Sequence, residues 1–235
     1  MHEEAAMIPP LRFAQMLSSR LCHDLIAPVG AINSGLELLL DDGAEQNAEL
    51  LQVVRTSAQT VARRLVFYRA VFGFSAAVQF KGLQDVSRFL QDYLTTTKVN
   101  LVWPLYEEPS SVDMATSEID YASWGRILAN LTLLLCEAAP RGGTLTIKYT
   151  SADPSILPVL ILEGSLVPLK IGVERTLWNL VAEDDISPHE AQAHLATLLL
   201  EEMGVEIERL EVSAERITLT LKKKQGGLRS LFSQK

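Results

Sequence analysis

The sequence predicts an α+β protein made of two parts, an antiparallel helical hairpin at residues 9–73 and an α/β sandwich at residues 76–223. Two observations carry this prediction. Apolar residues recur every three or four positions up to Phe72, with one short interruption at Asp41-Asp42-Gly43. After Gly73 the pattern changes to short strand-like runs that alternate with helical ones.

The first part reads as two long amphipathic helices. The apolar stripe of the first helix comprises Ala14, Leu17, Leu21, Leu25, Pro28, Ile32, Leu36 and Leu39. That of the second helix, which starts near Ala44, comprises Leu50, Val54, Ser57, Val61, Leu65, Tyr68 and Phe72. A short link makes the two helices antiparallel neighbours. One hairpin cannot bury both stripes, so we expect a homodimer that forms a four-helix bundle. The alternative is that the second half of the same chain covers the hairpin.

The second part mixes strands with about three helices. Helices are predicted over 80–97 and 118–139 and from the capping box Ser187-Pro188-His189-Glu190 to Met203. Strands are predicted over 99–107, 144–150, 156–164, 205–212 and 216–223. The remaining residues, 224–235, form a basic tail.

Net charge and the pattern of apolar residues argue against several classes of protein. The formal net charge of −8 disfavours nucleic-acid binding, because an acidic chain repels phosphate backbones. The longest apolar run, Ile127 to Ala139, is shorter than the ~18 residues that a membrane span needs. The N-terminus has no apolar core of a secretory signal, and Cys22 and Cys136 lie in apolar helical patterns, as reduced thiols do. We therefore expect a cytoplasmic protein.

His23 is the candidate reactive residue. At about 100° per residue it points away from Leu21 and Leu25 and hence away from the core. A solvated helix face normally carries long charged side chains, whereas the residues around His23 are small: Ser19, Ala27, Gly30 and Ser34. Such a face suits the docking of another protein. The alternative is an ordinary surface histidine.

Two neighbours strengthen this hypothesis. Pro28 cannot donate a hydrogen bond to the carbonyl of Asp24, so the helix should kink one turn after His23 and leave backbone polarity free. The Asp24 side chain can bind one imidazole nitrogen and select the tautomer. A neutral imidazole nitrogen is a competent nucleophile for a phosphoryl group. Cys22 lies about 100° around the helix from His23 and no further ligands appear, so no metal site is expected.

The run from His23 to Ile32, His-Asp-Leu-x-x-Pro-Val-x-x-Ile, resembles the phospho-acceptor box of histidine kinases. With RLCHDLIAPVGAINSGLELL, the chain is most similar to the ChpT-type histidine phosphotransferases of alphaproteobacteria, over residues 9–223. The resemblance implies a dimerising hairpin joined to a degenerate, Bergerat-like copy of the kinase ATPase domain. It also implies relay of a phosphoryl group through His23 between receiver aspartates, with Asp24 as the orienting partner of His23.

The same resemblance implies the partners. They would be the receiver of a CckA-like hybrid histidine kinase and CtrA-like and CpdR-like response regulators. Mg²⁺ would come with the receiver, and no cofactor would be bound by this chain. Arg20 lies one turn before His23 and could steady phosphoryl oxygens or the acidic receiver pocket, although an ordinary exposed arginine is an equal alternative. The expected partner-binding residues are Ser19, Arg20, Ala27, Gly30 and Ser34.

The second part departs from a working ATPase domain. Asn130 stands where the kinase asparagine box would be, but its surroundings are apolar, and Glu163-Gly164 retains one glycine of the expected motif. Residues 187–200 contain no glycine, so no glycine-rich backbone can wrap a triphosphate. We therefore expect phosphotransfer without kinase activity. Ala27 replaces the Thr or Asn that positions hydrolytic water in many such kinases, so phosphatase activity should be weak. The alternatives are an active histidine kinase core and a non-catalytic dimeric scaffold.

Overall fold

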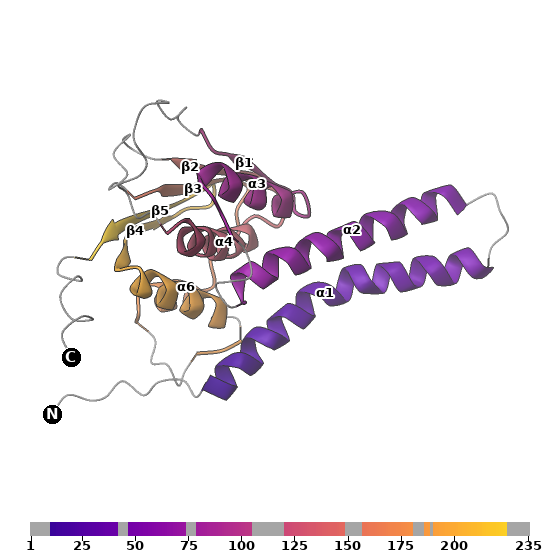
Figure 1. The fold of residues 1–235 in the computed structure, drawn as a ribbon, viewed down its shortest axis with the longest axis horizontal. Coiled ribbons are helices and arrows are strands. Elements are labelled where there is room, and N and C mark those ends of the chain that lie inside the picture. The colour runs from indigo at the N-terminus through magenta and orange to yellow at the C-terminus, as the bar shows by residue number, and fades with distance from the viewer. Residues whose placement is uncertain are drawn as a thin grey trace.

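The computed structural model describes residues 10–41, 47–73, 79–104, 120–148, 157–180, 186–188 and 190–224. Two long helices, α1 (Pro10–Asp41) and α2 (Asn47–Val71), form a hairpin that extends away from a mixed α/β part (Figure 1). This arrangement confirms the predicted α+β class and the antiparallel hairpin. The helix link at 42–46, the turn around 151–154 and the tail from 225 lie outside the described residues.

The hairpin is bent and closely packed. Helix α1 has one internal proline, Pro28, and it changes direction about midway along its length (Figure 1). Nearer the hairpin tip, Gly35 is buried against α2, and a Cβ atom added there would lie 2.6 Å from Cγ2 of Val54. The missing side chain therefore lets the two helices approach each other at this point.

The second part contains a five-stranded sheet in the order β1-β2-β3-β5-β4. Its strands are β1 (Val99–Val102), β2 (Gly143–Lys148), β3 (Val159–Gly164), β4 (Val205–Val212) and β5 (Arg216–Lys223). Strand β1 pairs parallel to β2 and the other neighbours are antiparallel. The last two strands have the predicted bounds. The first is shorter than predicted and lies at the sheet edge, with Pro104 beyond its end.

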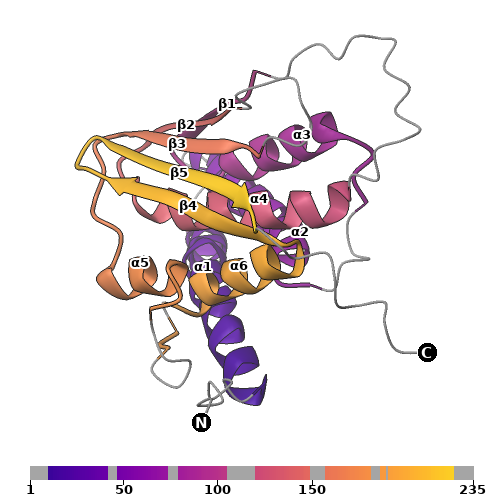
Figure 2. The same ribbon diagram turned by 90° about the vertical axis from the view of Figure 1, so that its left-hand side faces the viewer.

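Helices cover one face of the sheet (Figure 2). They are α3 (Leu83–Leu94), α4 (Tyr121–Glu137), α5 (Ile171–Leu177) and α6 (Ala191–Glu202). The sequence did not predict α5, because seven residues are too few to show a helical period. Helix α6 begins at Ala191, later than the predicted box, although the Ser187 amide does donate to the Glu190 carboxylate at 2.7 Å.

The core joins the hairpin to the α/β part. Phe67, Tyr68 and Val71 at the end of α2 belong to the main buried cluster, and Leu21 and Leu25 of α1 pack against it. The same chain therefore covers the apolar stripes at this proximal end of the hairpin, as the alternative interpretation held. Farther out, large apolar side chains are exposed; they are Ile26, Val29, Leu36, Leu38, Leu40, Leu51 and Val53.

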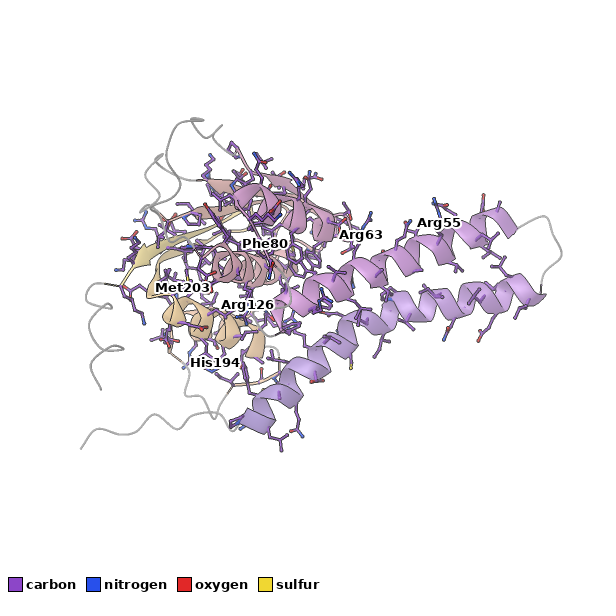
Figure 3. The ribbon with its side chains drawn as sticks, viewed as in Figure 1. Arg55, Arg63, Phe80, Arg126, His194 and Met203 are labelled. Carbon is purple, nitrogen blue, oxygen red and sulfur yellow. The ribbon has the colours of Figure 1, made fainter. Side chains whose placement is uncertain are left out.

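Helix α4 also binds the end of α2. Arg126 donates to the carbonyl of Gly73 at 3.2 Å, and the Asn130 amide donates to the carbonyl of Val71 at 3.4 Å. Both carbonyls lie at the C-terminal end of α2, where intrahelical donors are missing and a cation is favourable. Figure 3 shows Arg126 at this junction and Arg55 far from it, on the outer half of α2.

Among the described residues, no helix is long and apolar enough to cross a membrane.

Candidate functional site

His23 lies on the outside of α1, and its side chain is 88% exposed. The four small residues expected to surround it, Ser19, Ala27, Gly30 and Ser34, are exposed as well. A Cβ atom added to Gly30 would meet nothing within 4 Å. The imidazole therefore projects from a face of mostly small side chains, on which a second protein has room to approach; the exposed side chain of Ile26, three positions along the helix, is the large apolar neighbour on this face.

The carboxylate of Asp24 links His23 to the interior of the hairpin. One oxygen, Oδ1, lies 3.3 Å from Nδ1 of His23. The other, Oδ2, accepts a hydrogen bond of 3.0 Å from the hydroxyl of Tyr68 on α2. A carboxylate in contact with Nδ1 favours the tautomer that carries its proton there, which leaves Nε2 with a free electron pair. The free electron pair of Nε2 is therefore directed away from Asp24.

Tyr68 is a permanent donor in this contact. Its side chain is 2% exposed, and burial, followed by the negative charge of Asp24, raises the pKa of the phenol far above its usual range. The hydroxyl therefore keeps its proton at neutral pH and donates a hydrogen bond to Asp24.

The carbonyl that Pro28 leaves free has a partner. The guanidinium of Arg64, on α2, donates a hydrogen bond of 2.7 Å to the carbonyl oxygen of Asp24. A second nitrogen of the same guanidinium lies 3.5 Å from the carbonyl oxygen of Thr96, which follows α3. Free backbone polarity next to His23 was predicted, and Arg64 uses it to tie α1 to α2 and to the α/β part.

Arg20 differs from the expectation. Its side chain is only 11% exposed and forms an ion pair with Glu137 at the end of α4, while its Nε lies 3.8 Å from Oδ2 of Asp24. The guanidinium thus lies behind the His23 face rather than on it. The reason is long-range: α4 packs against the hairpin and brings a carboxylate within reach, which the hairpin sequence alone does not reveal.

Sequence reasoning missed three contributors, namely Tyr68, Arg64 and Glu137. Tyr68 was assigned to the apolar stripe, where its hydroxyl went unconsidered. A tyrosine inside a core stripe usually finds a hydrogen-bond partner, and this was the available signal. Arg64 and Glu137 carried no comparable signal, since exposed charges are common on helices.

Asn130 and Glu163, the residues expected to correspond to parts of a kinase nucleotide site, interact with other side chains and with the backbone of this protein. Asn130 is fully buried, donates to the carbonyl of Arg126 at 2.8 Å and accepts a hydrogen bond from Gln192 of α6. Glu163, on β3, lies 3.6 Å from the guanidinium of Arg216. Asn130 is thus satisfied by protein partners, and Glu163 is a half-exposed side chain beside Arg216.

Metal chemistry finds no support in the described part of the chain. There, no group of three or more His, Cys, Asp or Glu side chains is close enough to hold an ion. Cys22 and Cys136 are both unpaired thiols. The site presents an exposed imidazole, with the carboxylate of Asp24 against its Nδ1 and the exposed thiol of Cys22 beside it in the sequence.

The hairpin, the α/β part and this oriented histidine define a class, the histidine phosphotransferases. Residues 83–215 match the family described as the histidine phosphotransferase C-terminal domain. The chain is also 31% identical over 212 residues to the protein phosphotransferase ChpT of Brucella abortus (strain 2308), covering 89% of this chain and 95% of that protein. The chain belongs to this phosphotransferase family.

Solved structures agree with that assignment. A bacterial phosphotransferase of known structure, 27% identical, superimposes with a TM-score of 0.72 over 93% of this chain and 99% of its own. The histidine kinase AdeS of Acinetobacter baumannii, 16% identical, reaches a TM-score of 0.38 over 87% of this chain and 98% of its own, which is too distant to support an inference.

Proposed function

We propose that this protein relays a phosphoryl group through His23 between the aspartates of receiver domains. The observation that carries the proposal is the exposed imidazole whose Nδ1 lies against Asp24, so that Nε2 faces outward from a face of small side chains. This is the geometry required of a nucleophile that must enter the acidic pocket of another protein.

The transfer is a direct displacement at phosphorus. The electron pair of Nε2 attacks the phosphorus of a receiver's aspartyl phosphate, the P–O bond to the aspartate breaks, and a P–N bond forms. The Nδ1 proton stays on the ring, and Asp24 stabilises the positive charge that develops there. The reverse displacement passes the group to a second receiver. Mg²⁺ belongs to the receiver pocket, where it neutralises the phosphoryl oxygens.

Under this proposal the α/β part does not bind ATP. This expectation is supported by the burial of Asn130 among protein partners, by the ion pair of Glu163 with Arg216, and by the absence of glycine from residues 187–200. Ala27, exposed one turn after His23, has no group that could position a hydrolytic water, so intrinsic phosphatase activity should be weak. Phosphoryl loss would then proceed mainly by reverse transfer.

The proposed partners follow from the resemblance to ChpT-type proteins. They are the receiver of a CckA-like hybrid histidine kinase and CtrA-like and CpdR-like response regulators, met in the cytoplasm. On the hairpin, Ser19, Ala27, Gly30 and Ser34 form the face on which a receiver would dock. The net charge of −8 disfavours nucleic acid as a further partner.

We also propose a homodimer in which the outer halves of two hairpins form a four-helix bundle. Leu36 and Leu51 are 46% and 55% exposed, and similar side chains continue along both helices. Large apolar side chains exposed in this number on a monomer are typical of an interface. Two identical hairpins related by a two-fold axis would cover one another's faces.

A labelled transfer assay tests the relay. A receiver carrying ³²P on its aspartate should label the wild-type chain and the control variant His2→Ala, whereas His23→Ala should take up no label. ATP alone should not label any of the three. Labelling from ATP would favour the active kinase core, and absence of label from either donor would favour the non-catalytic scaffold.

Light scattering tests the dimer. The wild-type chain should have about twice its chain mass of 25.9 kDa at micromolar concentration. The double variant Leu36→Glu, Leu51→Glu should have the single-chain mass, because it places charges in the proposed interface. Leu198→Glu, at an exposed leucine of α6, is the matched control and should remain dimeric. A wild-type mass of one chain would contradict the proposal.

A further inference from the structure

The carboxylate of Asp24 is held at both oxygens, but only one of them meets His23. Oδ1 lies 3.3 Å from the imidazole, and Oδ2 receives the Tyr68 hydroxyl at 3.0 Å. An aspartate side chain rotates easily about its last bond, because that torsion has broad minima. Something must therefore keep Oδ1 directed at the imidazole, and Tyr68 is in contact with the opposite oxygen.

Tyr68 is itself rigid. Its ring is buried, and its centroid lies 6.2 Å from that of Phe67 and 5.5 Å from that of Phe72. Phe67 in turn stacks on Tyr93 of α3 at 3.7 Å. The hydroxyl is thus fixed by the core that joins the hairpin to the α/β part, and its position does not depend on the exposed face of α1.

Arg20, on α1, adds a second contact to the same oxygen, and the α/β part holds Arg20. Arg20 lies between Oδ2 of Asp24 and the carboxylate of Glu137, so that α4 holds the guanidinium in place. The backbone of Asp24 is fixed as well, through the hydrogen bond of its carbonyl with Arg64. Backbone and side chain of Asp24 are therefore both anchored to elements outside α1.

We infer that Tyr68 is a positioning residue of the phosphotransfer reaction: it holds Asp24 so that the carboxylate fixes the His23 imidazole with Nε2 outward. Glu137 supports the same arrangement through Arg20, so that the α/β part contributes indirectly to the orientation of the nucleophile. This inference rests on the proposed function, since it concerns how His23 is prepared to accept the phosphoryl group. Tyr68 touches neither the imidazole nor a docked receiver, so it acts on the rate of transfer and leaves docking unchanged.

The test compares two buried tyrosines. Tyr68→Phe removes the hydroxyl that meets Asp24 and keeps the ring in the core. Tyr93→Phe removes a hydroxyl from the neighbouring ring of the same cluster and is the matched control. With a ³²P-labelled receiver at varied concentration, Tyr68→Phe should lower kcat roughly tenfold or more, as the loss of one hydrogen bond to a charged carboxylate implies, with KM unchanged. Tyr93→Phe should keep both constants.

A spectroscopic readout separates positioning from a structural role. In ¹⁵N-histidine-labelled protein, the imidazole of His23 should show mainly the tautomer protonated at Nδ1. Tyr68→Phe should shift it toward a mixture of tautomers, Glu137→Gln should do so to a smaller extent, and Tyr93→Phe should leave it unchanged. Thermal unfolding of each variant checks that the fold is kept.

The outcomes distinguish this inference from the proposed function. If the wild-type chain takes up no label, the relay itself is wrong. If the wild-type chain is labelled while Tyr68→Phe has the wild-type kcat and the wild-type tautomer ratio, the relay stands and the role of Tyr68 is overturned. A raised KM with unchanged kcat would also overturn it, because it would place Tyr68 in docking.

Discussion

The guanidinium of Arg64 donates a hydrogen bond of 2.7 Å to the carbonyl oxygen of Asp24, the carbonyl that Pro28 cannot serve. A proline within a helix removes the donor that residue i−4 would use, and a carbonyl left without a donor in a partly buried place is unfavourable. Here the second helix supplies a charged donor instead. The break in α1 is thereby part of the contact between the two helices, one turn from His23.

This relationship predicts a coupling between two distant substitutions. Arg64→Met keeps most of the apolar stem and removes the charged donor, so it should lower the free energy of unfolding by about 1.5–3 kcal/mol. In a Pro28→Ala background the new amide can serve the Asp24 carbonyl, and the same substitution should then have a smaller effect. Urea unfolding of the four proteins of this cycle measures the coupling, which should be about 1 kcal/mol or more.

Arg63 provides the control for that cycle. It lies next to Arg64 in the sequence, but its guanidinium pairs with Asp92 of α3 at 3.1 Å on the surface (Figure 3). Arg63→Met should change stability by less than about 1 kcal/mol and show no coupling to Pro28→Ala. Equal effects of Arg64→Met in both backgrounds would contradict the assignment.

The hairpin and the exposure of His23 were predictable because both follow from local periodicity. The apolar stripes place α1 and α2, and the angle between His23 and Leu21 on one helix places the imidazole outside. The strand bounds of β4 and β5 were equally accessible, since β5 alternates along its length, β4 alternates on either side of a register shift between Ile207 and Arg209, and a short turn separates the two strands.

What surrounds Asp24 was not predictable in the same way. Arg64 and Tyr68 reach it from positions 40 and 44 residues away, and the match depends on how far α2 slides along α1. Glu137 is 117 residues from Arg20 and arrives with α4. Such pairings are set by the packing of whole elements, which periodicity does not determine.

Two glycines of α1 should respond oppositely to alanine. At Gly35 the added methyl group would lie 2.6 Å from Cγ2 of Val54, so Gly35→Ala should lower the free energy of unfolding by about 1–3 kcal/mol. At Gly30 nothing lies within 4 Å, and Gly30→Ala should raise it by about 0.5–1 kcal/mol through helix propensity. Thermal denaturation compares the two. Val54→Ala combined with Gly35→Ala should recover part of the loss, and a loss that persists unchanged would show that the helix contact is not its cause.

The N-terminal cap of α4 should make the free energy of unfolding depend on pH in the acidic range. Asp120 accepts hydrogen bonds from the amides of Ala122 and Ser123 at 3.1 Å, and the Ser123 hydroxyl bond is the main cause that lowers the pKa of this carboxyl. A lowered pKa stabilises the fold above the ordinary value of about 3.9, and the contribution disappears as pH falls through the lowered folded value. Asp120→Ala should therefore lower the free energy of unfolding by about 0.5–2 kcal/mol at pH 7 and by less near pH 3.

Asparagine at the same position is the control for the charge. Asp120→Asn keeps an oxygen that accepts from the two amides and does not titrate. Its stability at pH 7 should stay close to that of the wild-type protein. Chemical denaturation between pH 3 and pH 7 compares the variants, and an Ala effect of constant size across that range would contradict the role of the carboxylate.

The two thiols should differ sharply in reactivity, and the difference reports on docking. Cys22 is exposed beside His23, whereas burial raises the pKa of the Cys136 thiol to about 12, so Cys136 stays protonated and unreactive at pH 7. A maleimide should label one cysteine of the native chain and both after unfolding in urea.

In a Cys136→Ala variant, an excess of receiver should slow the labelling of Cys22, because docking over His23 covers its neighbour. An unrelated acidic protein of similar size should not slow it. A rate for Cys22 that is the same with and without receiver would place the docking surface elsewhere on the molecule, even if His23 proved to carry the phosphoryl group.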